Sequence, residues 1–146
     1  MASLEDNGKI VLIDFEYGWW NPRYYDLANS INEFVSVYNH PVAPGLHFYY
    51  NNAATNTEIE QITKQYWTLL TGGEKVWSLA EKDCAKALEK TKACMLLNDY
   101  SRAVKQIIKL TELNETDPTL WYWAQLEGCC RRYKRSVQQF GGFGAI

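Results

Sequence analysis

The sequence has no strong excess of charge of either sign, no long apolar run and no secretory leader. Its 146 residues include 17 acidic and 15 basic side chains, which gives a formal net charge of −2. This balance argues against a generic nucleic-acid-binding domain, because such domains use an excess of Lys and Arg to contact phosphates. No uncharged apolar run approaches the roughly 18 residues that a membrane-spanning helix needs. Residues 1–6 are acidic and lack the basic and apolar regions of a signal peptide. We therefore expect a cytoplasmic domain with no membrane span.

Cysteine is also too scarce for the disulfide framework of a small secreted protein. The chain has four cysteines, at Cys84, Cys94, Cys129 and Cys130. The adjacent pair Cys129-Cys130 lacks the Cys-x-x-Cys spacing of a zinc site, and His40 and His47 lie far away in the sequence. We expect reduced thiols that are mostly packed in the interior rather than a zinc site.

The sequence does contain enough apolar side chains for a folded core. Apolar residues make up 47% of the chain, with six Trp, ten Tyr and five Phe, which is sufficient to offset chain entropy on folding. Residues 1–56 are rich in aromatic residues, Asn and Pro, whereas residues 57–146 show successive helical patterns. We expect a mainly α protein with a short N-terminal β element, organised as these two segments.

The β element is predicted close to the N-terminus. Residues 10–13 form a β-branched apolar run that ends at an acid, as in a buried strand. Asn7-Gly8 before this run is a strong short-range signal for a hairpin. A hairpin needs a partner strand upstream, yet only six residues precede Asn7. Either the hairpin interpretation is wrong, or the chain begins inside an element that was once longer.

Helical spacing of apolar residues recurs through the rest of the chain. Asp26 lies at or near the start of the first helix, where a carboxylate can satisfy free amide groups. Thr57 and Glu60 fit a capping box, and Asn98 or Asp99 fits a cap further along. The expected helices run from about 25 to 38, from Thr57 to Gly72-Gly73, from about 74 to 97, from about 100 to 113, and from Asp117-Pro118 to the region before Gly141, with an irregular loop over 39–56.

One internal similarity raises a different possibility. Residues 100–107 match residues 133–140 at four of eight positions, with an offset of 33 residues, near the period of tetratricopeptide-type repeats. A helical repeat module would bind a protein partner in a groove between helix pairs and would place Arg102 and Arg135 in equivalent positions. Because only two copies are present and stacked repeats normally need three or more, coincidence between two amphipathic helices is the alternative.

Residues 11–34 contain the most informative polar pattern. Asp14 directly follows the predicted strand, and a carboxylate at the end of a buried strand is costly unless it is paired. A Mg²⁺ ion that bridges phosphates would provide the partner, because Mg²⁺ takes one or two carboxylates together with phosphate oxygens. A strand-end Asp that caps a turn is the alternative, and the residues alone favour it.

The order and spacing of the residues in this region resemble the signature of the choline/ethanolamine kinase family. The matching residues are Ile13-Asp14-Phe15-Glu16-Tyr17, Asn21, Tyr25-Asp26-Leu27-Ala28-Asn29 and Asn32-Glu33-Phe34. The resemblance implies a partial C-terminal lobe of a protein-kinase-like fold. It also implies Mg²⁺-dependent transfer of the γ-phosphoryl group of ATP to ethanolamine or choline, in phospholipid biosynthesis. The ending Asn-Glu-Phe is more similar to ethanolamine kinases than to choline kinases.

The resemblance implies roles for four residues. Asp14 would bind the metal, as the Asp of the kinase Asp-Phe-Gly motif does, and Asp26 would brace the catalytic loop. Glu33 would face the substrate ammonium, and Tyr38 would line the site of this cationic group, since a carboxylate and aromatic faces together hold a cation. On one helix, Glu33 and Tyr38 would be about 140° apart, so that they would flank a cleft rather than share a face.

The chain departs from the family pattern in several places. The family's phosphate-binding loop, ATP-pairing Lys and His-x-Asp catalytic loop precede the Asp-Phe-Glu motif, and the 13 residues before Asp14 contain none of them. Ser30 stands where the family usually has His. Trp121 and Trp123 are two residues apart rather than three, so we expect them to pack in the core. The expectation is a C-terminal kinase fragment that has no catalytic residue of its own and is inactive alone.

Overall fold

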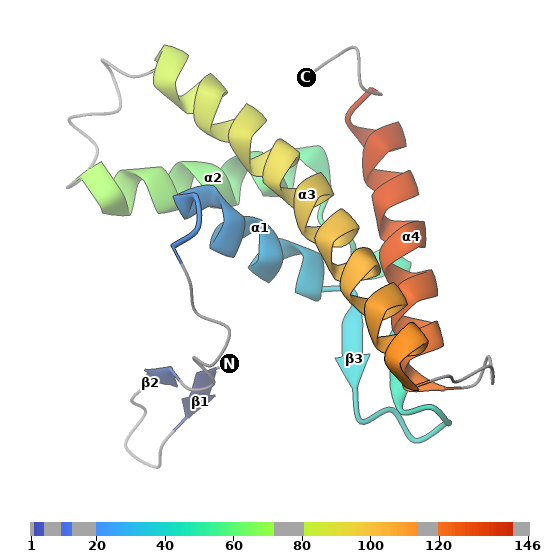
Figure 1. Ribbon diagram of the computed structural model, residues 1–146. Helices are drawn as coiled ribbons and strands as arrows, with labels where there is room; N and C mark the ends of the chain where they lie inside the picture. Colours follow the sequence, from blue (N-terminus) through green and yellow to red (C-terminus); the bar gives the residue numbers. More distant parts are fainter. Residues whose placement is uncertain (1, 5–9, 13–19, 72–80, 114–119, 142–146) are drawn as a thin grey trace.

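The computed structural model describes residues 2–4, 10–12, 20–71, 81–113 and 120–141, which are mainly helical (Figure 1). In chain order the elements are β1 (Ala2–Leu4), β2 (Ile10–Leu12), α1 (Arg23–Glu33), β3 (Ser36–Tyr38), β4 (Leu46–Phe48), the 3₁₀ turn η1 (Tyr50–Asn52), α2 (Asn56–Thr71), α3 (Glu81–Leu113) and α4 (Trp121–Gln139). The expected fold class, mainly α with a short N-terminal β element, is confirmed. None of the helices in the described ranges is both long enough and apolar enough to cross a membrane.

Strands β1 and β2 pair in antiparallel fashion, which favours the hairpin interpretation of the Asn-Gly pair between them over the alternative that this interpretation is wrong. Ala2 lies opposite Leu12, and Leu4 lies opposite Ile10. The intervening residues 5–9 are outside the described ranges. Because three residues on each side suffice for this pairing, the short upstream segment is no obstacle to a hairpin.

Helix α1 ends earlier than the apolar spacing predicted, at Glu33 rather than near Tyr38. The chain then forms β3, which pairs with β4 so that Tyr38 lies opposite Leu46. Asn39 follows β3 with a φ of 64°, a left-handed conformation that Asn adopts more easily than most residues. The prediction of an irregular loop over 39–56 is therefore wrong where β4 and η1 form.

Helix α2 begins with a capping box two residues earlier than predicted. The Thr55 amide donates to Glu58 Oε2 (2.8 Å), and the Glu58 amide donates to Thr55 Oγ1 (3.3 Å). The predicted partner Glu60 instead forms an ion pair with Lys64 (2.7 Å). The Thr-x-x-Glu pattern occurs twice in succession, and the earlier copy makes the cap. Its hydrogen bonds also lower the pKa of Glu58.

Helix α3 continues through Asn98 and Asp99, where the sequence predicted a break between two helices. Both side chains are buried and have partners on other helices. Asn98 Nδ2 donates to Asn29 Oδ1 of α1 (3.0 Å), and Arg132 Nε of α4 donates to Asp99 Oδ1 (2.9 Å). Such residues end helices when they bond to the local backbone. Here tertiary partners satisfy them, so the predicted cap is wrong.

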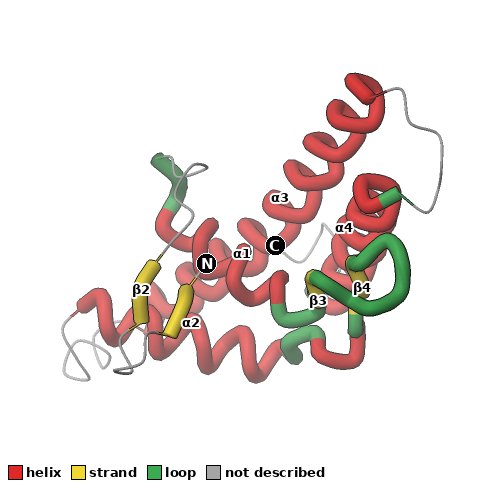
Figure 2. Tube along the Cα trace, turned by 90° about the horizontal axis from the view of Figure 1, so that it is seen from below, coloured by secondary structure: helices red, strands yellow, loops and turns green. Residues whose placement is uncertain are grey.

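Helix α3 is the central element of the described structure. Helix α4 runs antiparallel beside it, and α1 and α2 also pack against it (Figures 1 and 2). The core contains residues from both predicted segments. Its buried apolar members are Tyr24, Ala28, Ile31, Ala54, Ile59, Ala87, Cys94, Met95, Leu96 and Phe140.

The described thiols are free, as expected. Cys94 and Cys129 are buried and Cys130 is exposed, so the prediction of mostly packed thiols is confirmed for two of these three. The side chain of Cys84 lies outside the described part of the chain.

The two segments that match at a 33-residue offset lie in different environments. Ile107 is 50% exposed, whereas its counterpart Phe140 is 7% exposed and belongs to the core. Arg102 forms an ion pair with Glu33, whereas Arg135 is exposed on α4. The predicted equivalence of the two arginines is therefore wrong. The similarity reflects two amphipathic helices rather than a repeated unit.

Candidate functional site

Glu33 and Tyr38 meet at the junction between α1 and β3. Glu33 is the last residue of the helix, and Tyr38 is the last residue of the strand that follows. The Tyr38 hydroxyl donates a hydrogen bond to Glu33 Oε2 (2.7 Å). The structure thus brings together two residues that the sequence singled out as a pair. The predicted arrangement on one helix is wrong, because the chain leaves α1 before it reaches Tyr38.

Arg102 of α3 completes this cluster. Its Nη1 atom forms an ion pair with Glu33 Oε1, and its Nη2 atom donates to the Tyr38 hydroxyl (3.2 Å). The side chains of Arg102 and Glu33 are 23% and 27% exposed. Burial lowers the pKa of the Arg102 guanidinium and raises the pKa of the Tyr38 hydroxyl. Sequence reasoning did not assign Arg102 to this site, because nothing in its local pattern links it to a glutamate 69 residues earlier.

A cavity of about 510 Å³ lies beside this cluster, between α3 and the start of α4. Its aromatic walls are Tyr38, Trp121 and Tyr122, and the last two rings meet edge to face with their centres 5.4 Å apart. The remaining lining residues are Arg102, Lys105, Gln106, Lys109 and Gln125. Trp121 thus lines a cavity, and the prediction that it packs in the core is wrong.

Two lining amides have unsatisfied hydrogen-bonding capacity. Gln106 and Gln125 are 5% and 4% exposed, and their Oε1 atoms have no hydrogen-bond partner within the described structure. A buried polar oxygen without a partner costs about 1–3 kcal/mol. A ligand that carries N–H or O–H donors would relieve this cost.

A second ion pair holds β3 in position. Arg132 of α4 donates from Nε to Asp99 Oδ1 (2.9 Å) and from Nη1 to Ser36 Oγ (2.8 Å). Its guanidinium also lies 5.2 Å from the centre of the Phe48 ring. Asp99 is fully buried, and burial raises its pKa to about 6 although Arg132 acts in the opposite direction. Because Ser36 begins the strand that ends at Tyr38, this pair anchors the first residue of that strand.

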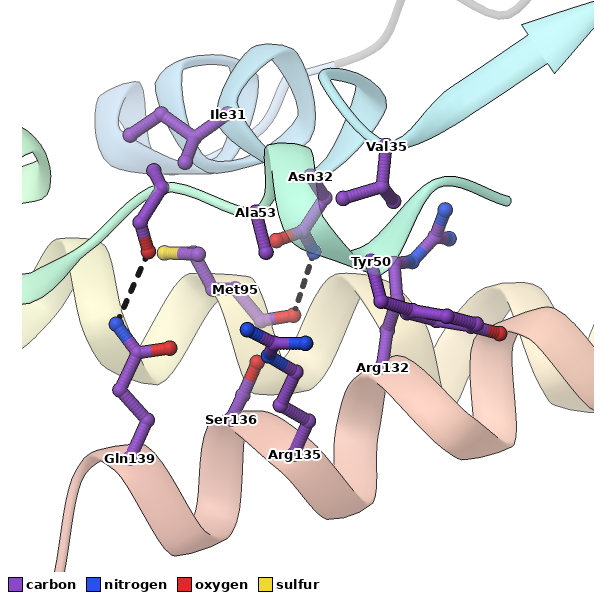
Figure 3. A pocket seen from close by; sticks show the side chains of 11 residues that line it. Ile31, Asn32, Val35, Tyr50, Ala53, Met95, Arg132, Arg135, Ser136 and Gln139 are labelled. Carbon is purple, nitrogen blue, oxygen red and sulfur yellow. Dashed lines mark hydrogen bonds between the residues drawn. The ribbon is translucent and has the colours of Figure 1, made fainter.

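Asn32, another residue of the sequence motif, has a structural role. Its Nδ2 atom donates to the Met95 carbonyl (3.0 Å; Figure 3). The same atom donates to Asn98 Oδ1 (3.4 Å), and the two hydrogen bonds fasten α1 to α3. The small cavity beside it has a volume of about 20 Å³, which is room for roughly one water molecule. This cavity is therefore too small for an organic ligand.

The other two predicted site residues lie elsewhere. Asp26 is exposed in the first turn of α1, so its predicted place near the helix start is confirmed. Asp14 lies outside the described residues. Among the residues that the structure does describe, no group of three or more His, Cys, Asp or Glu side chains could hold a metal ion.

The pair formed by Glu33 and Tyr38 has the chemistry to hold an organic cation, whereas the cavity beside it is lined by the cationic side chains of Arg102, Lys105 and Lys109. A carboxylate supplies the negative charge, and aromatic faces next to it add about 0.5–2 kcal/mol for each cation–π contact. The cation that Glu33 holds in this structure is the chain's own Arg102.

Comparisons with known proteins match much of the chain to one family. A family model described as choline/ethanolamine kinase matches residues 1–125. A choline kinase of Saccharomyces cerevisiae (strain ATCC 204508 / S288c) is 50% identical over 38 residues, which are 26% of this chain and 6% of the yeast protein. The chain therefore matches only a small part of the length of this relative.

Proposed function

Since the chain belongs to the choline/ethanolamine kinase family, we propose that it is a segment of a kinase that transfers the γ-phosphoryl group of ATP to an amino alcohol. The observation that supports this proposal is the pair formed by Glu33 and Tyr38, which already binds a cationic group. In the proposed function, the ammonium group of ethanolamine or choline takes the place of that cation. The product would be a phosphorylated amino alcohol for phospholipid biosynthesis.

We propose ethanolamine as the preferred amino alcohol. Its primary ammonium has three N–H donors, whereas the quaternary ammonium of choline has none. Glu33 accepts such donors, and the unpartnered oxygens of Gln106 and Gln125 belong to side chains that line the adjacent cavity. A site with buried acceptors disfavours a ligand that cannot donate to them.

The family also implies ATP and Mg²⁺, for which we propose Asp14 as a metal ligand. The described residues do not by themselves provide a set of donors for the ion. No His-x-Asp sequence occurs within the 146 residues, and the chain thus offers no counterpart of the family's catalytic base. We propose that the 146-residue chain does not transfer phosphate by itself.

We also propose a role for Asp26, a cytoplasmic location for the protein, and a surface that binds another polypeptide. Asp26 would brace the catalytic loop of the intact kinase from the exposed side of α1. A cytoplasmic location accords with the free thiols of the described cysteines. The exposed apolar side of α3, which includes Leu97 and Ile108, is the surface through which we propose the helical region contacts another polypeptide.

Two measurements on the purified chain test this function. In an NMR titration with ethanolamine, we expect shifts of the signals of Glu33, Tyr38 and Arg102 that disappear in Glu33→Gln. Glu127→Gln is the matched control, because Glu127 is an exposed acid in an ion pair with Arg131, and we expect it to respond like the wild type. An unchanged response in Glu33→Gln would contradict the assigned site.

In an assay with radiolabelled ATP, turnover above background would contradict the proposed inactivity of the isolated chain.

A further inference from the structure

Both oxygens of the Glu33 carboxylate lie against the chain's own side chains, Oε1 in an ion pair and Oε2 in a hydrogen bond. Oε1 faces the Arg102 guanidinium, and Oε2 accepts from the Tyr38 hydroxyl. The Arg102 guanidinium in turn donates to that hydroxyl (3.2 Å). A ligand ammonium that approaches Glu33 thus meets a carboxylate that is already neutralised. It also meets the positive side chains of Arg102, Lys105 and Lys109 on the wall of the cavity through which it would enter.

We infer that Arg102 is an internal competitor of the cationic ligand and sets the affinity and selectivity of the amine site. The inference rests on the proposed function, since it concerns the same carboxylate. Bound to Glu33, the guanidinium closes the site. Released from Glu33, it leaves Oε1 open to an ammonium, while the Tyr38 hydroxyl still donates to Oε2. Only the fraction of molecules with Arg102 released binds the amine, so the apparent affinity falls in proportion to that fraction.

The position of this ion pair distinguishes it from the surface pairs of the described structure. Glu60–Lys64 and Glu127–Arg131 each join neighbouring turns on the solvent-facing side of a single helix. Arg102 and Glu33 join two different helices, and each side chain is about three-quarters buried. Solvent and salt therefore screen their attraction less than that of a surface pair.

The cavity beside Arg102 can receive its guanidinium when the ion pair with Glu33 breaks. Arg102 lines the cavity of about 510 Å³ together with the rings of Trp121 and Tyr122. An Arg side chain stacks favourably on aromatic faces, so release from Glu33 does not require the guanidinium to enter an apolar interior.

The inference is tested by calorimetric titration of ethanolamine into the wild type, Arg102→Met and Arg102→Gln. We expect the affinity to rise about five- to tenfold in both variants, as for the loss of a partly buried ion pair. Arg131→Met is the matched control, because it removes an arginine from an exposed ion pair, and its affinity should equal that of the wild type. In the double variant Glu33→Gln/Arg102→Met the gain should disappear.

The outcomes separate this inference from the proposed function. If the wild type binds ethanolamine and both Arg102 variants bind it equally or more weakly, Arg102 is not a competitor and the proposed function stands. If neither the wild type nor either Arg102 variant binds ethanolamine, the amine site itself is refuted, and the competitor with it. Circular dichroism and thermal unfolding of each variant establish that it is folded. Arg102→Gln preserves a polar side chain in case Arg102→Met weakens the packing of α1 on α3.

Discussion

Replacing Arg132 with Met should destabilise the protein strongly above pH 7 and only weakly near pH 5. Arg132 is the counter-charge of Asp99, whose side chain is fully buried. Without it, the carboxylate is left in the interior with no partner for its charge. The same substitution removes the hydrogen bond to Ser36, which anchors the strand that carries Tyr38.

The magnitude follows from two contributions. Removing one partner of a buried ion pair costs about 3–5 kcal/mol, because the remaining charge is uncompensated. The lost hydrogen bond to Ser36 accounts for about 1 kcal/mol of this at any pH. Since a domain of this size has a free energy of unfolding of about 5–15 kcal/mol, the variant should still fold but with a much lower denaturation midpoint.

The pH dependence follows from the proton affinity of Asp99. Burial raises its pKa from 3.8 to about 6 in the folded chain, so the folded state binds the proton more tightly than the unfolded state. The contribution of this group to stability is thus fully present below about pH 4 and is lost as the pH rises through 6. That loss amounts to about 3 kcal/mol in the wild type. In Arg132→Met the pKa of Asp99 rises further, because Arg132 no longer stabilises the carboxylate. Stability therefore continues to fall above pH 6 in this variant. Near pH 5, Asp99 is mostly protonated in both proteins.

Urea unfolding followed by tryptophan fluorescence at pH 5 and pH 7.5 measures these differences. We expect a loss of about 1–2 kcal/mol at pH 5 and about 3–5 kcal/mol at pH 7.5. Asp99→Asn/Arg132→Met is the control, because it removes the buried charge and should be more stable than Arg132→Met at pH 7.5. The reasoning is refuted if the destabilisation by Arg132→Met is the same at both pH values, or if the double variant is no more stable than the single one.

Two further changes test the packing of β4 and the start of α2. A Cβ atom on Gly128 would lie 2.2 Å from the Phe48 ring, so we expect Gly128→Ala to destabilise the protein by about 1 kcal/mol or more. In a Phe48→Ala background the same change should instead stabilise α4 by up to about 1 kcal/mol, and urea titrations that give one sign in both backgrounds would contradict the contact. Thr55→Ala should cost about 1 kcal/mol through loss of the cap. Thr57→Ala, at the exposed position where the cap does not form, should change the unfolding free energy by less than about 0.5 kcal/mol.

Local patterns predicted those elements that local interactions determine. The Asn7-Gly8 pair predicted the pairing of β1 with β2, and apolar spacing predicted the helical region that contains Ile31. The end of α1 could not be predicted in this way, because Tyr38 continues the helical spacing although it lies on a strand. Likewise, Asn98 has the chemistry of a helix cap, and only its partners on α1 explain why α3 continues through it.

The same distinction applies to the site. The motif singled out Glu33 and Tyr38, which are five residues apart in the sequence. Their side chains are in contact although Tyr38 lies on a strand rather than on the helix. Arg102 belongs to another helix, and its pairing with Glu33 depends on how α3 packs against α1 through Asn32 and Asn98. The motif singled out Glu33 and Tyr38 but gave no sign of the distant side chain that pairs with them. Whether the Glu33 carboxylate is available to an incoming amine therefore depends on how the helices pack. The affinities of the Arg102 variants for ethanolamine measure this availability.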